Sequence, residues 1–293
     1  MGEKVPHPVT TTRALGPFKP SAGNGVGVPA LFPYVHGKMK ILAMCNNKGG
    51  VGKTTICFCL AGSLAQMGQR VLLVDMDQQG SLSSSFVPNI HELPCHLAEA
   101  LLDDRKSIRE AIQRTDFDNI DIIPANQKLA KIESELLSER DAHHYLGDKL
   151  DEIKGDYDII LLDSPPNLGL ASWSVLTASD GVIIPLEAQD YSVKGTGYVH
   201  GLIQKVRRRA NPNLRILAYI INRYDGRRRI ERDFKAMIER HLGEKASSHV
   251  LKDSVKYVEA VTLGKPITYL APNSDQAAVF RQIGKEVLNA KRL

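Results

Sequence analysis

This 293-residue chain has its most informative motif at Ile41-Leu-Ala-Met-Cys-Asn-Asn-Lys48-Gly-Gly-Val-Gly-Lys53-Thr-Thr55. This motif predicts a buried strand, a glycine-rich turn and a helix that opens at Lys53. Because glycine has no Cβ, consecutive backbone N–H groups can turn inward around an anion, and the helix N-terminus adds its positive dipole end. The pattern predicts a phosphate-binding loop in which Lys53 reaches the β- and γ-phosphates and the Thr54 hydroxyl ligates Mg²⁺.

This loop resembles the deviant Walker A motif of the ParA/MinD family of P-loop ATPases. The resemblance rests on the run from Lys48 to Thr55, which has an early lysine directly before the glycine pair. Asn47 occupies the position where the general P-loop pattern has glycine. The resemblance implies that Lys48 reaches across a dimer interface to the nucleotide of the partner subunit. It implies ATP and Mg²⁺ as cofactors and a nucleotide site formed by Lys48, Gly49, Gly50, Val51, Gly52, Lys53, Thr54 and Thr55.

Two further apolar runs end in carboxylates. A predicted strand over 71–74 leads into Asp75-Met-Asp77-Gln-Gln-Gly80, and Asp158-Ile-Ile-Leu-Leu-Asp163 leads into Ser-Pro-Pro, where the prolines forbid continuation of the strand. Ligands of open α/β sheets bind at such carboxyl ends. Asp75 is equally consistent with a carboxylate that orients the loop and with a direct catalytic role.

The same resemblance assigns roles at these strand ends. It implies that Asp77 orients the attacking water and touches the Mg²⁺ shell, although the family proline after it is Gln78 here. It implies that Asp163 holds Mg²⁺ through water. The catalytic pair is then Lys48 and Asp77, and the metal set is Thr54, Asp77 and Asp163.

The remaining chain continues the alternation of strands and helices. Strands are predicted over 120–123, 181–185 and 216–222, and helices after Ser107, around Trp173 and over 192–209. The predicted fold is α/β, a doubly wound, mostly parallel twisted sheet with helices on both faces. Asn222 ends a strand and resembles the family residue that reads the adenine edge, while a turn-forming asparagine is the competing interpretation.

Composition restricts the class of protein. Residues 1–38 are rich in Pro and Gly without sustained periodicity, which predicts a flexible tail followed by an ATPase domain over 39–293. No apolar run approaches the ~20 residues that a membrane span needs. The four cysteines, without CxxC spacing or a secretory signal, predict reduced, buried thiols and a cytoplasmic protein.

Positive charge is concentrated in one window. Between residues 194 and 229 there are ten basic residues and one acidic residue, so this window has a net charge of +9. The whole chain has a net charge of +5, and the residues outside the window therefore carry −4. We expect a surface for a polyanion. The hypothesis for the DNA contacts is Arg207, Arg208, Arg209, Arg227, Arg228 and Arg229.

The resemblance covers roughly residues 39–290 and implies a ParA-type ATPase. Such a protein dimerises on ATP, binds DNA non-specifically on the nucleoid, and hydrolyses ATP to drive plasmid or chromosome partitioning or cargo positioning. A ParB-like centromere-binding protein or a cargo adaptor is the implied partner. The main alternative is a MinD-like membrane-cycling ATPase, although the residues after Ala290 are too few for an amphipathic membrane helix. An iron–sulfur relative and a structural DNA-coating protein are further alternatives.

Overall fold

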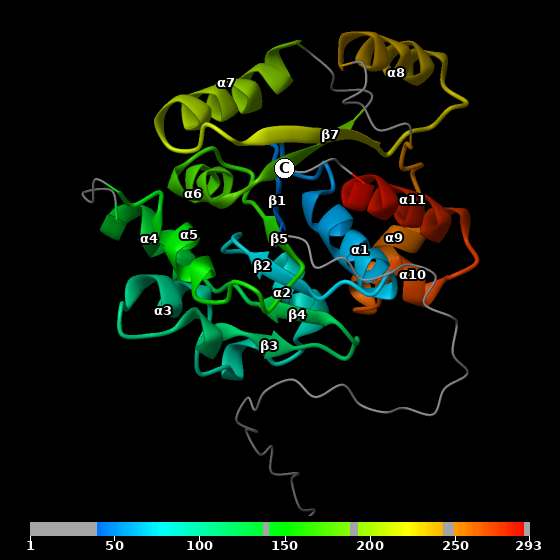
Figure 1. Ribbon diagram of the computed structural model, residues 1–293. Coiled ribbons are helices and arrows are strands. Elements are labelled where there is room, and N and C mark those ends of the chain that lie inside the picture. Colours follow the sequence, from blue (N-terminus) through cyan, green and yellow to red (C-terminus); the bar gives the residue numbers. More distant parts are fainter. Residues whose placement is uncertain (1–39, 137–140, 188–192, 243–248, 290–293) are drawn as a thin grey trace, which may run out of the picture. The chain divides into compact units, whose positions relative to one another are not determined.

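A seven-stranded sheet crosses the part of the computed structural model that is described here, residues 40–136, 141–187, 193–242 and 249–289 (Figure 1). The strand order is β3-β4-β2-β5-β1-β6-β7, and every pair is parallel except β3–β4. The predicted mostly parallel sheet is confirmed. The strands are β1 (Lys40–Met44), β2 (Val71–Asp75), β3 (Gln113–Arg114), β4 (Ile120–Ile123), β5 (Ile159–Asp163), β6 (Gly181–Glu187) and β7 (Arg215–Asn222).

Helices cover both faces of the sheet (Figure 1). One face packs on α3 (Leu97–Leu102), α4 (Leu129–Leu136), α5 (Tyr145–Asp151), α6 (Leu170–Ala178), α7 (Val193–Arg209) and α8 (Arg229–Leu242). The other face packs on α1 (Lys53–Gln66), α2 (Ser81–Phe86), α9 (Val255–Thr262), α10 (Ile267–Leu270) and α11 (Asp275–Asn289). Two short 3₁₀ turns are η1 (Ile90–Glu92) and η2 (Ile108–Ala111). The doubly wound architecture is therefore confirmed as well.

Two of the central strands are buried along their whole length. The five residues of β2 and the five of β5 are all buried, because both faces of the sheet are covered. The sequence after Ser107 forms the turn η2 rather than an α-helix, with the expected capping box between Ser107 and Glu110. The predicted tail, residues 1–38, lies outside the described residues, so the domain boundary stays a prediction.

The register of three neighbouring strands places the site. Asp163, the last residue of β5, pairs with Asp75 at the end of β2 and with Met44 at the end of β1. The strands are parallel, so their carboxyl ends meet at one edge of the sheet. Both predicted carboxylates therefore lie beside the glycine-rich turn that follows β1.

Candidate functional site

The turn between β1 and α1 has the backbone of an anion-binding loop. Gly50 and Gly52 adopt left-handed conformations with φ of 77° and 93°, and Gly52 is the N-cap of α1. Left-handed residues in such a turn direct successive N–H groups to one side. A Cβ on Gly52 would come 2.2 Å from the amide nitrogen of Asn222, so this position excludes any side chain. The predicted phosphate loop is present in the backbone itself.

Lys53 and Thr54 are placed at the start of α1 by this turn. Lys53 is only 7% exposed, and its Nζ donates to the carbonyl of Lys48 at 3.2 Å, across the loop that it closes. Burial lowers the pKa of the Lys53 ammonium, while the carboxylate of Asp163 acts in the opposite direction. The Thr54 hydroxyl donates to Asp163 Oδ2 at 2.7 Å. Two residues 109 positions apart in the sequence thus meet, and their role as metal ligands stays a prediction.

Asp163 carries a buried oxygen atom without a partner. Among the described residues, its Oδ1 has no hydrogen bond, although the residue is 1% exposed. Burial raises the pKa of Asp163, and the nearby Asp75 raises it further, so an added positive charge would stabilise the ionised form. Carboxylate and hydroxyl oxygens are the ligands that Mg²⁺ prefers. The Thr54 and Asp163 oxygens therefore fit a magnesium ion held beside the phosphate loop.

Asp75 orients the loop that carries Asp77. Its Oδ1 accepts the backbone N–H of Asp77 at 3.0 Å, and its Oδ2 accepts both the N–H and the hydroxyl of Ser83, at 2.9 and 2.6 Å. With no exposed surface, Asp75 is sealed beneath the loop. Of the two interpretations that the sequence left open for Asp75, this geometry favours the orienting role. Asp77 itself is half-buried, and its carboxylate accepts the N–H of Gln79 at 3.0 Å.

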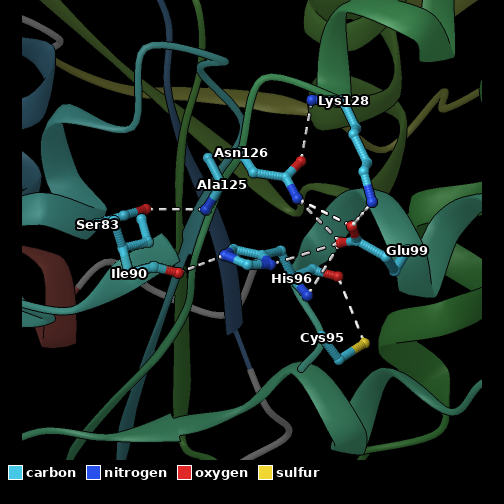
Figure 2. A network of polar contacts seen from close by, with 8 residues as sticks. All are labelled: Ser83, Ile90, Cys95, His96, Glu99, Ala125, Asn126 and Lys128. Atoms are coloured by element: carbon cyan, nitrogen blue, oxygen red, sulfur yellow. Dashed lines mark hydrogen bonds and ion pairs between the residues drawn. The ribbon is translucent and has the colours of Figure 1, made fainter. Parts of the chain in front are cut away.

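A hydrogen-bonded network continues from Ser83 into the loop after β4 (Figure 2). The Ser83 hydroxyl accepts the N–H of Ala125 at 2.9 Å, and the next side chain, Asn126, donates to both oxygens of Glu99. Lys128 also donates to Glu99, at 2.7 Å. The 125–128 loop is therefore held at one end by Ser83 of α2 and at the other by Glu99 of α3. The sequence contained no motif that predicted this network.

A groove of about 270 Å³ lies between the three loops of the site. Its lining includes Asp77 and Gln79 after β2, Leu129 at the start of α4, and Pro165 and Asn167 after β5. One wall of the groove is therefore the loop predicted to orient the attacking water. Another wall begins at Leu129, directly after the 125–128 loop that the Ser83 network holds.

Lys48 points to a carboxylate of its own chain. Its Nζ lies 3.0 Å from Glu187 Oε2, and Arg223 Nη1 lies 3.0 Å from the other oxygen, Oε1. The Lys48 side chain is 45% exposed, as expected for a lysine that can reach another molecule. Neither Glu187 nor Arg223 was singled out in the sequence.

Asn222 supports the phosphate loop from below. Its amide donates to the carbonyl of Val51 at 2.8 Å and contacts Gly52, and the side chain is 7% exposed. Directly beyond it, a cavity of about 700 Å³ is lined by residues that include Arg223, Tyr224 and Asp253. The structure thus places Asn222 against the glycine turn; its role toward adenine stays a prediction.

The two arginine triplets differ in their surroundings. Arg227 forms two hydrogen bonds with Asp225, at 2.9 and 3.0 Å, which hold the pKa of that carboxyl at about 2. Arg228 lies within ion-pair distance of both Asp225 and Glu231, and Arg229 lies 3.8 Å from Asp233. The second triplet is therefore largely neutralised by local acids.

The first triplet, at the end of α7, has no acidic partner among the contacts of the described residues. Arg207 donates to the carbonyl of Leu214 at 2.7 Å and is half-buried. Arg208 and Arg209 are exposed. The net positive charge of the basic window consequently lies on α7 more than on the turn before α8.

The four cysteines are free and buried, which confirms the prediction of buried thiols. Burial raises the pKa of Cys45 to about 11 and that of Cys59 to about 12. Within the described ranges, no helix has the length and apolarity needed to cross a bilayer.

The glycine turn, the closing lysine and the buried Thr54–Asp163 pair define a P-loop nucleotide-binding protein. A family model described as an AAA domain matches residues 39–216. The sporulation initiation inhibitor protein Soj of Bacillus subtilis is 35% identical over 248 residues, which cover 85% of this chain and 98% of Soj. The chromosome-partitioning ATPase Soj of Thermus thermophilus is 33% identical over 253 residues, covering 86% of this chain and 96% of that protein.

A solved structure agrees with the P-loop fold. Cobyrinic acid a,c-diamide synthase from Mycobacterium smegmatis, with bound ADP and magnesium, superposes with a TM-score of 0.75 at 30% identity, over 85% of this chain and 94% of that chain. The chain belongs to the AAA domain family and, within it, to the ParA/Soj-type partitioning ATPases. The resemblance predicted from the sequence is therefore confirmed.

Proposed function

We propose that this protein binds ATP with Mg²⁺, dimerises in the ATP-bound state and hydrolyses the nucleotide. The ATP-bound dimer binds DNA without sequence preference and so positions a plasmid, a chromosome or a protein assembly. The observation that carries the proposal is the buried Thr54–Asp163 pair beside the phosphate loop, in which Asp163 Oδ1 has no hydrogen bond to any described residue. The ADP and magnesium in the M. smegmatis relative support these ligands.

Each residue of the loop has a distinct task in this proposal. Backbone N–H groups from Gly49 to Thr55 bind the phosphates, and Lys53 neutralises the β- and γ-oxygens. Thr54 and Asp163 hold the Mg²⁺, which supplies charge neutralisation on the phosphate chain when bound. Asp77 contacts the Mg²⁺ shell and orients the attacking water from the loop that Asp75 fixes.

Lys48 acts in trans. An exposed lysine on the outer side of the phosphate loop can place its ammonium on the triphosphate of a second subunit. A cation supplied in trans is worth roughly 10³ to 10⁵ in the hydrolysis rate of other NTPases. Hydrolysis requires the dimer for this reason. The adenosine end of the nucleotide occupies the cavity beyond Asn222, whose amide keeps the loop and the base-binding segment together.

DNA binding rests on the two arginine triplets, with the larger share on α7. Arg208 and Arg209 contact DNA phosphates, and each released counterion makes the affinity fall with salt. Arg207 supports them, while Arg227, Arg228 and Arg229 contribute less because Asp225, Glu231 and Asp233 offset their charge. A ParB-like protein or a cargo adaptor stimulates hydrolysis and releases the dimer from the nucleoid in the cytoplasm.

The deciding experiment measures DNA retention at two salt concentrations, with no nucleotide, ADP, ATP, and ATP plus the Lys48→Ala variant. Retention only with ATP, lost in high salt and in the variant, is the expected result. ATP-dependent dimers that float with anionic liposomes and ignore DNA would support a MinD-like cycle instead. ATP-dependent DNA binding without phosphate release would identify a DNA-coating protein.

A matched pair of variants tests the DNA surface. Arg208→Ala/Arg209→Ala should weaken retention strongly and leave ATP binding unchanged. The control is Arg105→Ala/Lys154→Ala, which removes the same charge at two exposed positions. Arg105 lies in the loop between α3 and η2, and Lys154 lies in the loop between α5 and β5. Equal losses in both double variants would show that only the overall charge matters.

A further inference from the structure

Glu187 is shared by two cations at the outer side of the phosphate loop. Lys48 Nζ lies at its Oε2 and Arg223 Nη1 at its Oε1, both at 3.0 Å. The carboxylate side chain is 14% exposed, whereas Lys48 and Arg223 are 45% and 58% exposed. A carboxylate that has lost most of its water needs at least one cation beside it, because an unpaired charge in such a place is costly.

Two of these three side chains stand on strand ends, and one stands on the glycine turn. Glu187 ends β6 and Arg223 follows β7, while Lys48 belongs to the loop. Arg223 has φ of 53°, a left-handed conformation that is unfavourable for a residue with a Cβ. It persists because the next N–H, of Tyr224, is held by the carbonyl of Leu251 at 3.0 Å. Arg223 is therefore fixed next to Glu187 and over Gly50, 4.0 Å from where a Cβ of that glycine would lie.

We infer that Glu187 is a latch that holds Lys48 within its own subunit, and that Arg223 is the cation that replaces Lys48 on this carboxylate when Lys48 leaves. The guanidinium fork of Arg223 matches both oxygens of a carboxylate, so the departure of Lys48 leaves no unpaired charge. The triphosphate of a second subunit competes with Glu187 for Lys48. Glu187 and Arg223 thus act on the reaction through Lys48, as positioning residues. This inference rests on the proposed function, since it concerns the lysine that acts in trans.

The latch predicts opposite effects for its two members. In Glu187→Gln the hold on Lys48 is weakened, so dimerisation should need about two- to fivefold less ATP, the range expected for a partly exposed ion pair. In Arg223→Ala the Glu187 carboxylate loses one of its two cations and holds Lys48 more strongly. Dimerisation should therefore need more ATP by a similar factor. The double variant should have the Lys48 acylation rate of Glu187→Gln, because Arg223 acts on Lys48 only through Glu187; its ATP requirement does not isolate this effect, since Arg223 also lines the cavity proposed for the adenosine.

Two measurements on the full chain test this. The ATP concentration for half-maximal dimerisation is measured by light scattering. The rate of Lys48 acylation by an N-hydroxysuccinimide ester is measured without nucleotide, by mass spectrometry of the peptide, with Lys154 as the internal reference. A lysine side chain released from its ion pair is more accessible to the reagent, so Glu187→Gln should raise the Lys48 rate about two- to fivefold and Arg223→Ala should lower it. The control is Glu239→Gln, the same change at the ion pair of Lys235 on α8, which should alter neither value.

The results separate the latch from a scaffold. If Glu187→Gln and Arg223→Ala both impair dimerisation while Lys48 acylation stays unchanged, the three residues only support the loop and the inference is wrong. It is also wrong if Arg223→Ala keeps its full effect on Lys48 acylation in the Glu187→Gln background. A wild-type chain that fails to dimerise with ATP would refute the proposed function, and the acylation rates would still decide whether Glu187 holds Lys48.

Discussion

Replacing Ser83 by alanine removes the link between Asp75 and the loop after β4. Figure 2 shows the contact of Ser83 with Ala125 in that loop. The Ser83 hydroxyl has no exposed surface; it donates to Asp75 Oδ2 at 2.6 Å and accepts the N–H of Ala125 at 2.9 Å. A hydrogen bond to a charged group is worth about 1.5–3 kcal/mol, and a buried N–H left without an acceptor costs about 1–3 kcal/mol. These contributions overlap, so we expect a loss of about 3 kcal/mol in the free energy of unfolding.

A loss of about 3 kcal/mol corresponds to a fall in Tm of about 6–12 °C for a domain of this size. Catalysis should suffer separately from stability. Asp75 keeps the N–H of Asp77 but loses one of its three donors, so the loop is held less firmly and hydrolysis should fall about ten- to a hundredfold. Binding of ATP should change much less, because neither Ser83 nor Ala125 belongs to the phosphate loop.

The matched control is Ser85→Ala on the same helix. Ser85 is half-buried, and among the described residues its hydroxyl donates only to the carbonyl of Ser81, at 2.9 Å and at the surface. Its removal should therefore change stability by less than about 0.5 kcal/mol. Thermal unfolding followed by circular dichroism and phosphate release at saturating ATP give the two readouts. If Ser83→Ala and Ser85→Ala have the same Tm and the same turnover, the reasoning from the network is refuted.

Three more predictions follow from the site and the core. Gly52→Ala must accommodate a Cβ 2.2 Å from the Asn222 amide at a φ of 93°, so ADP binding by calorimetry should be lost; unchanged affinity would contradict the loop geometry. Arg208→Ala/Arg209→Ala should reduce the slope of log K against log salt for DNA by about 1.8, whereas an unchanged slope would exclude these contacts. The cysteines should resist iodoacetamide at pH 8. The raised pKa of Cys45, about 11, means that its stabilising contribution exists below about pH 8.5 and is lost as the pH rises towards 11; urea unfolding at several pH values measures this.

The sequence predicted the strand ends of the site well, because local patterns determine them. An apolar run followed by Asp75 or Asp163 indicates a buried strand with a carboxylate at its end, and both strands are present. The pairing of these two residues in one register could not be read from the sequence, because it depends on β5 lying between β2 and β1. Glu187 also ends an apolar strand, and the rule that found the two aspartates would have found it too.

Partners across space explain what the sequence did not predict. The count of ten basic residues between 194 and 229 was correct, but it ignored Glu231 and Asp233, which lie just beyond that window and pair with Arg228 and Arg229. Ser83 belongs to no motif, and its importance comes only from the meeting of Asp75 and Ala125, 50 residues apart in the chain. Tertiary contacts of this kind need the fold before they can be named.

Two buried aspartates make the free energy of folding less favourable, and a bound cation would offset this effect. Burial raises the pKa of both Asp163 and Asp75, and the Asp75 carboxylate, its neighbour in register, raises the pKa of Asp163 further. Thr54 and Lys53 only partly offset this effect at Asp163, whose Oδ1 stays without a hydrogen bond among the described residues. Replacing Asp163 by asparagine should therefore stabilise the nucleotide-free chain while it weakens Mg²⁺-dependent nucleotide binding. A stability cost of this kind is expected where a fold keeps charges buried for function.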